Sequence, residues 1–180
     1  MTALLAENED APDAWPDAPA GLSTEAAAIP PETVWLRIEG WVSTRWAARS
    51  VTYLIEGPGE WTPRLSPFTA TSAELWTGES WETATLHPSP LGGFMLDAEG
   101  PYRIIGTAGD GSAPPANVEE AYRRLAEYFA AARAAGGVGS TFGSMSSGDL
   151  SLSDRPSKWI AQAIHLSGAS DLLRRYRRLA

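Results

Sequence analysis

Few residues in this chain have the type and spacing that catalysis or metal binding requires. The two histidines, His87 and His165, lie far apart, and neither belongs to an HxH or HExxH pattern or has a carboxylate at ligand spacing. The chain has no cysteine, which excludes thiol chemistry, disulfides and cysteine-ligated zinc. We therefore expect ordinary histidines, no bound metal and no cofactor.

Two segments rich in glycine and serine also fail to match known catalytic motifs. Residues 136–140 superficially resemble a phosphate-binding loop, but they lack the lysine and hydroxyl ending and follow a predicted helix where the motif needs a strand. The segment Ser147-Gly148-Asp149 does not place a nucleophile beside a base, and no GxSxG motif is present. The sequence therefore predicts a protein that is not an enzyme.

The eight tryptophans allow two interpretations. Six of them could form an aromatic platform for sugars, as in a small carbohydrate-binding module rich in β-structure: Trp35, Trp41, Trp46, Trp61, Trp76 and Trp81. Many of them lie beside prolines or in predicted strands, where large aromatic side chains usually fill a core or an interface. We favour the core interpretation, and carbohydrate binding is the alternative function.

Length and charge limit the function further. A chain of 180 residues is expected to form one domain and can bury a core without metals or disulfides. The net charge is −8, yet residues 171–180 carry four arginines against one acid, while residues 1–30 hold six acids and no base. An acidic chain is poorly suited to tight binding of nucleic-acid phosphates. No leader-like start or apolar run of about 20 residues is present, so we expect a soluble protein away from membranes.

One long amphipathic helix is predicted over residues 114–135. Asn117 and Glu120 fit a capping box, Glu120 and Arg124 are spaced for an ion pair, and Gly136-Gly137 end the segment. The apolar stripe contains Val118, Ala121, Tyr122, Leu125, Phe129 and Ala132. The remaining elements are expected to be placed against this helix.

The region before the helix predicts a small antiparallel sheet with one face for the helix, and hence an α+β fold. Residues 1–30 lack periodicity apart from a possible turn at 23–28, and we expect a mobile acidic arm there. The predicted elements are a short helix at 31–42, a strand at 50–56, a hairpin formed by 72–76 and 81–86, and strands at 93–96 and 102–107 around a turn at 99–101.

The region after the helix predicts a long loop and two short helices. Residues 136–154 are dominated by glycine and serine, and such loops are usually functional or disordered. A helix is predicted over 156–166 with Gly168 as its stop, and Ser170 is expected to cap a last segment. In that segment Leu172, Tyr176 and Leu179 occupy one side with Leu173 at its edge, and four arginines occupy the other.

Several segments in a fixed order resemble the head-to-tail connector, or adaptor, family of long-tailed bacteriophages and the related gene transfer agents. The resemblance covers about residue 31 to the end, and the acidic residues 1–30 depart from the helical start usual in that family. The segments are Ile38-Glu39, Thr44-Arg45, Arg49-Ser50-Val51-Thr52, GPGEW at 57–61, Ser66-Pro67-Phe68, ELWTGESWE, PYRIIGTAG, AYRRLAEY and the closing LLRRYRRL.

This resemblance implies a structural protein located in the virion neck, and in the host cytoplasm during assembly. Members form rings, commonly of twelve copies, beneath the portal, and DNA passes through the lumen toward the tail. On this interpretation residues 31–180 form a single adaptor domain. The portal-binding residues would be Leu172, Leu173, Arg174, Arg175, Tyr176, Arg177, Arg178 and Leu179. A neighbouring subunit, or a stopper or other neck protein, would contact Gly136, Gly139, Phe142, Met145, Asp149 and Leu152.

Overall fold

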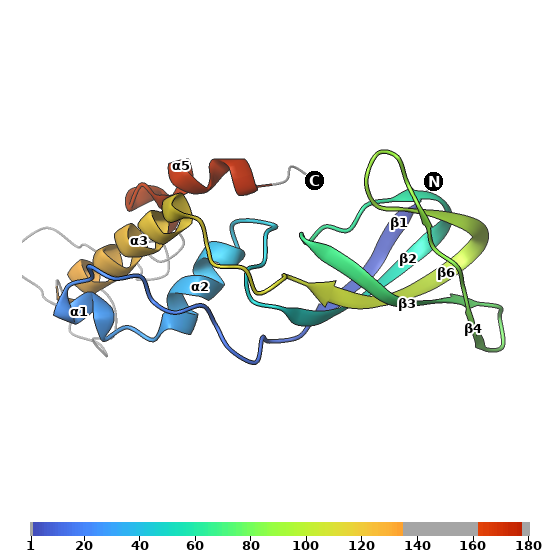
Figure 1. Ribbon diagram of the computed structural model, residues 1–180, viewed down its shortest axis with the longest axis horizontal. Coiled ribbons are helices and arrows are strands. Elements are labelled where there is room, and N and C mark those ends of the chain that lie inside the picture. The colour runs from blue at the N-terminus through green and yellow to red at the C-terminus, as the bar shows by residue number, and fades with distance from the viewer. Residues whose placement is uncertain (1, 135–161, 178–180) are drawn as a thin grey trace, which may run out of the picture. The chain divides into compact units, whose positions relative to one another are not determined.

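The structure is a computed structural model that describes residues 2–134 and 162–177 (Figure 1). The fold is α+β, which confirms the predicted class. The described residues divide into two compact units. We call residues 2–15 and 43–113 the sheet unit, and residues 16–42, 114–134 and 162–177 the helical unit. Each unit is described by itself.

The sheet unit is one antiparallel sheet in the order β1-β2-β6-β3-β4, with the short β5 also paired to β6. The long strands β2 and β6 pair along almost their whole length, from Arg49 opposite Ala108 to Trp61 opposite Phe94. The strand bounds are β1 Ala3–Glu9, β2 Arg49–Trp61, β3 Phe68–Trp76, β4 Trp81–Thr83, β5 His87–Pro88 and β6 Phe94–Ala108. Strand β2 confirms the predicted strand at 50–56 but continues past its expected end to Trp61. The β3–β4 hairpin confirms a second prediction, with its second strand ending at Thr83.

Alternating apolar side chains of β2 form the core of this unit. Val51, Tyr53 and Ile55 are fully buried because every second residue of a strand points to the same face. The Tyr53 ring lies 5.0 Å from the Trp61 ring, and its hydroxyl oxygen accepts the Leu65 N–H at 3.2 Å. Burial raises the pKa of Tyr53 to about 12. The phenol is therefore a structural group that stays neutral.

The prediction of two separate strands around a turn at 99–101 is wrong. Residues 94–108 form the single strand β6, in which Gly100 lies opposite Gly57 and the register shifts between Gly57 and Gly59. A Cβ atom at Gly57 would lie 2.6 Å from the Ala98 carbonyl oxygen, so the two strands approach too closely there for a side chain. The glycines therefore mark an irregularity within one strand, where the sequence suggested a turn.

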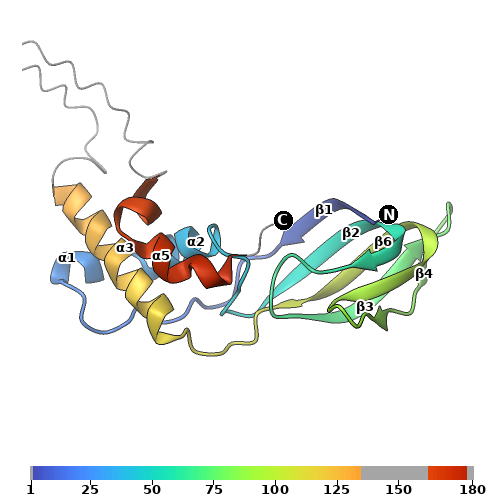
Figure 2. The same ribbon diagram turned by 90° about the horizontal axis from the view of Figure 1, so that it is seen from above.

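The helical unit is arranged around the predicted long helix α3, which spans Ala116–Ala134 (Figure 2). The other elements are α1 Thr24–Ala27, α2 Pro31–Glu39, α5 Ala169–Leu173 and the 3-10 turn η1 Arg174–Tyr176; residues 162–166 are also helical. The α2 prediction is confirmed. None of these helices, within the described residues, is long and apolar enough to span a membrane.

The buried stripe of α3 differs slightly from the predicted one. Its fully buried positions include Leu125 and Tyr122. The centroid of the Tyr122 ring lies 5.0 Å from that of the Trp35 ring on α2. Ala126 and Ala130 continue the stripe, whereas Phe129 is only half-buried. Alanine allows close contact with a neighbouring backbone, and α3 contacts α1, α2 and α5.

Residues 1–30 contain more regular structure than the sequence suggested. Strand β1 pairs with β2, and α1 occupies the place of the possible turn. Ser23 caps α1 by accepting the Ala26 N–H, and its own N–H and hydroxyl donate to the Glu127 carboxylate on α3 at 2.7 and 2.8 Å. These two bonds lower the pKa of Glu127. The mobility of an N-terminal arm and the single-domain boundary at residue 31 stay predictions.

Candidate docking site on the C-terminal segment

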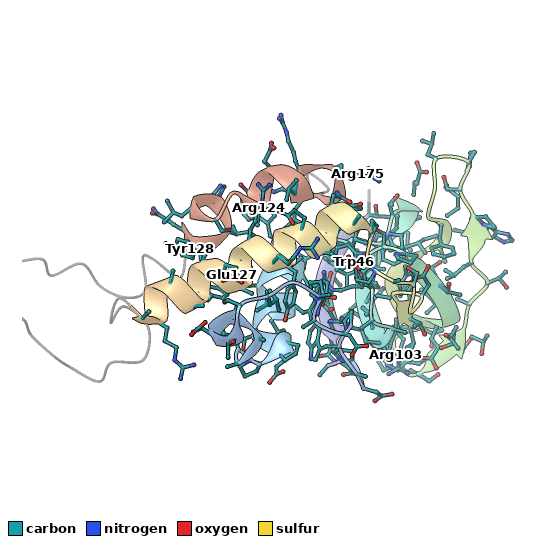
Figure 3. All side chains as sticks on the ribbon, turned by 60° about the vertical axis from the view of Figure 1, so that its left-hand side comes forward. Trp46, Arg103, Arg124, Glu127, Tyr128 and Arg175 are labelled. Atoms are coloured by element: carbon teal, nitrogen blue, oxygen red, sulfur yellow. The ribbon has the colours of Figure 1, made fainter. Side chains whose placement is uncertain are left out.

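The C-terminal segment, residues 169–177, folds onto α3 within the helical unit (Figure 3). Ala169 and Leu173 are fully buried, whereas Arg174, Arg175 and Arg177 are exposed. One face of this short segment therefore belongs to the core, and the other presents guanidinium groups to solvent.

The cap of this segment differs from the prediction. Gly168, with a φ of 74°, precedes α5 as its N-cap, and Ser170 lies inside the helix. The left-handed conformation of Gly168 ends the preceding helical residues and starts α5 at once, so Ser170 cannot occupy the capping position. The predicted stop at Gly168 is confirmed.

Asn117 connects the start of α3 to the C-terminal segment. Its Nδ2 donates to the Leu172 carbonyl oxygen at 3.1 Å, and its Oδ1 accepts the Tyr176 hydroxyl at 3.0 Å. The predicted capping box is therefore wrong, because Asn117 lies within α3 and its side-chain amide is used by the distant segment. The Pro115 carbonyl accepts the first helical N–H groups instead. Sequence reasoning missed this role because the partners are 55 and 59 residues away.

Trp41, which follows α2, provides a second anchor. The Arg177 guanidinium lies 4.3 Å from the Trp41 ring centroid, and the His165 ring meets the same ring edge-on at 4.6 Å. The Arg175 guanidinium lies 4.8 Å from the Tyr176 ring centroid. The aromatic contacts limit where these two arginines can lie while leaving their N–H groups available.

The exposed arginines of this segment form what we call the arginine face: Arg174, Arg175 and Arg177. Within the described part of the chain, no ion pair joins any of them to a carboxylate. A guanidinium group presents a planar set of donors that fits a carboxylate or a phosphate. The geometry therefore suits an anionic partner.

The apolar side of the segment differs from its predicted pattern. Leu173, expected at the edge, is fully buried, and Leu172 is half-buried. The packing of α5 decides which of its side chains face α3. The spacing of three leucines in ten residues does not predict that packing. Arg178 and Leu179 lie outside the described residues. So does the predicted contact loop, with Gly136, Gly139, Phe142, Met145, Asp149 and Leu152.

The sheet unit contains a cavity and an exposed histidine–carboxylate pair. A cavity of about 240 Å³ has no acidic or basic side chain in its lining. It is lined by Thr62, Pro63, Leu65, Ser66, Pro67, Phe68, Leu91, Gly92, Gly93 and Phe94. His87 Nε2 lies 3.4 Å from Asp97 Oδ2, and both side chains are more than half exposed. Among the described residues, no group of three or more histidines and carboxylates is arranged to hold a metal.

Three of the six tryptophans considered for a sugar platform are buried. Trp35, Trp46 and Trp61 are buried, as the core interpretation predicts. Trp76 and Trp81 pair across the β3–β4 hairpin with ring centroids 5.4 Å apart and planes at 56°, so they do not form a flat surface for a sugar ring. Arg103 covers Trp81 at 4.5 Å.

Comparison with known proteins gave one structural similarity. No protein-family model matches this chain, and no curated protein matches it. A chain in the solved structure titled "Virion of native gene transfer agent (GTA) particle" is similar at 18% sequence identity, over 83% of this chain and 75% of that chain, with a TM-score of 0.48. At this identity and TM-score, the similarity establishes neither a shared fold nor a shared function.

Proposed function

We propose that this protein is a structural head-to-tail adaptor of a virion neck, which forms a ring beneath the portal, joins capsid to tail and lets DNA pass. The proposal starts from the sequence resemblance to the adaptor family. The observation that carries it furthest is the arginine face, which lies on a segment fixed to the helical unit by Leu173 and Asn117 and has no carboxylate partner among the described residues.

The geometry revises which residues would meet the portal. Leu173 is buried within its own helical unit and Tyr176 is hydrogen-bonded to Asn117, so neither is free to fill a portal groove as the sequence suggested. In this proposal the portal is contacted by Arg174, Arg175 and Arg177. The matching surface of the portal would carry carboxylates.

The charge distribution suits a conduit for DNA. The sheet unit holds twelve acids against four arginines, a net charge of −8, whereas the described helical unit holds eight acids against seven arginines, a net −1. A wall that carries excess negative charge does not hold DNA phosphates in transit. In the proposed ring the contact loop at 136–154 would meet neighbouring subunits or a stopper protein.

Co-sedimentation with purified portal rings tests the proposal. Arg174→Glu should reduce the bound fraction strongly at low salt and less at high salt, since exposed charges are screened within about 8 Å at physiological ionic strength. Arg133→Glu, which changes the same charge at an exposed position in the last turn of α3, is the matched control and should bind like the unmodified protein. Equal binding by both variants would count against portal docking through the arginine face.

The carbohydrate-binding alternative has less support. Of the tryptophans proposed as a sugar platform, three are buried and the pair on the hairpin is tilted. A titration of tryptophan fluorescence with oligosaccharides tests it directly, and we expect no saturable change. A saturable change that disappears in Trp76→Ala would favour the alternative.

A further inference from the structure

Strand β1 is added to the sheet without contributing to its core. All seven residues of β1 are exposed or half-buried. The buried cluster of the sheet unit comes from β2, β3, β6 and the residues after β2, and it includes no residue of β1. The edge strand is therefore held in a different way from the strands beside it.

Backbone pairing and charge hold β1 in place. The pairing runs from Ala3 opposite Glu56 to Glu9 opposite Val51, with a shift in register after Leu4, and the Asp10 N–H extends it by donating to the Ser50 carbonyl at 3.0 Å. Such pairing supplies affinity for almost any extended segment, so the side chains must supply the selectivity.

Selectivity comes from Glu9. Its carboxylate accepts three hydrogen bonds: from the Arg45 Nε–H at 2.5 Å, from an Arg45 η N–H at 3.0 Å and from an Arg49 η N–H at 3.1 Å. Both arginines are only 7% exposed, and Arg49 is further oriented by its bond to the Ala47 carbonyl and by the Trp15 ring at 4.9 Å. By contrast, Glu7 pairs with Arg64, whose side chain is 60% exposed, although the Glu7 side chain itself is only 12% exposed.

We propose that the edge of β2, together with Arg45 and Arg49, is a binding site for an extended acidic segment. Residues 2–10 of the same chain fill it here, and the site takes the same residues from a second copy of the protein. A second copy makes identical contacts, and residues 10–22 contain neither helix nor strand that would fix which copy supplies the segment. This inference is independent of the proposed portal contact.

The segment of the same chain has a thermodynamic advantage over any added peptide, and the test must remove it. A tethered segment acts at an effective concentration on the order of millimolar, so a free peptide cannot compete with it in the intact chain. The experiment uses the full-length protein with a protease site inserted between Pro12 and Asp13, cleaved after folding. A fluorescent peptide of residues 2–12 is then added, and its entry is followed by anisotropy.

The labelled peptide should replace the cleaved segment and saturate one site per protein. A peptide with Glu9→Gln should bind about tenfold or more weakly, because two buried arginines lose their charged acceptor. The matched control Glu7→Gln should weaken binding by no more than about threefold, since its partner is exposed to solvent. No entry of labelled peptide, or equal effects of the two substitutions, would overturn the binding site.

Exchange between intact copies is tested with cysteines, which the natural chain lacks. Asn8 lies opposite Thr52 in the register, so a mixture of Asn8→Cys and Thr52→Cys proteins at high concentration should give mixed disulfides on mild oxidation. The control is Thr83→Cys, an exposed residue on β4 at the opposite edge of the sheet. Mixed disulfides no more abundant with Thr52→Cys than with Thr83→Cys would overturn exchange between copies.

Discussion

Arginine is used differently in the two units. All four arginines of the sheet unit pair with carboxylates: Arg45 and Arg49 with Glu9, Arg64 with Glu7, and Arg103 with Glu74. In the described helical unit, Arg123 and Arg124 share Glu120, while the arginine face has no such partner. An arginine with its own carboxylate serves the fold, and one without a carboxylate is available to another molecule. The helical unit is therefore the better candidate for docking, although the sheet unit carries most of the charge.

The largest expected effects are in the core beneath the arginine face. Leu173→Ala and Leu125→Ala remove fully buried side chains and should each lower the free energy of unfolding by about 2–5 kcal/mol, measured by urea denaturation. Deleting residues 171–180 removes Leu173 as well, so it should destabilise the protein instead of removing only a docking element. If Leu173→Ala cost as little as a surface substitution, the C-terminal segment would not belong to the helical core.

The next effect concerns the paired arginines of the sheet unit. Burial raises the pKa of Glu9, but the hydrogen bonds and charges of Arg45 and then Arg49 outweigh it and lower the pKa below 4.5. A lowered pKa stabilises the folded state fully above the unfolded-state value, and that stability is lost as pH falls through the folded-state value. Glu9→Gln should cost about 1.5–3 kcal/mol at pH 7, as hydrogen bonds to charged groups do.

Unfolding curves at several pH values measure this contribution. The difference between the unmodified protein and Glu9→Gln should shrink as pH falls below 4.5, because the carboxyl group is protonated first in the unfolded state and, at lower pH, in the folded state as well. Glu120→Gln, whose carboxylate is solvent-exposed, should show a smaller difference throughout. A difference for Glu9→Gln that does not change with pH would mean that charge is not what holds β1.

Patterns confined to neighbouring residues predicted the fold well. The apolar period of α3, the early proline of α2, the β-branched and aromatic residues of β2 and the turn of the β3–β4 hairpin are local signals, and all four elements are present. Strand β1 lacked such a signal because none of its side chains is fully buried and because it depends on β2 for its pairing. The continuous strand β6 was missed because its glycines accommodate an irregularity that resembles a turn in the sequence.

The candidate site was predictable only in part. Clustered arginines near the end of the chain are visible in the sequence, and three of them are exposed. Which leucine would be buried, and what would hold Tyr176, depend on contacts with α3 more than 50 residues earlier. Asn117 looked like a helix cap because its local spacing fits one, and spacing alone does not reveal a distant hydrogen-bond partner.

A smaller effect tests the link between α3 and the arginine face. Asn117→Ala removes two hydrogen bonds at a half-buried position and should cost about 1–2 kcal/mol, whereas Tyr176→Phe removes one and should cost about 0.5–1.5 kcal/mol. The double variant should cost less than the sum of the two, because both single changes break the same bond to Tyr176. Strict additivity in the urea measurements would show that Asn117 and Tyr176 do not interact.

The smallest expected effect separates the two uses of arginine most directly. Arg174→Ala should change the free energy of unfolding by less than about 0.5 kcal/mol, because the exposed side chain has no carboxylate partner in the described residues. Arg103→Ala should cost more, about 1–2 kcal/mol, since its guanidinium bonds Glu74 at 2.5 and 2.6 Å and covers Trp81. In the portal assay the order should reverse, with Arg174→Ala reducing binding and Arg103→Ala leaving it unchanged. If instead Arg174→Ala destabilised the isolated protein as much as Arg103→Ala does, the arginine face would be part of the fold, and portal docking would have to be sought on another surface.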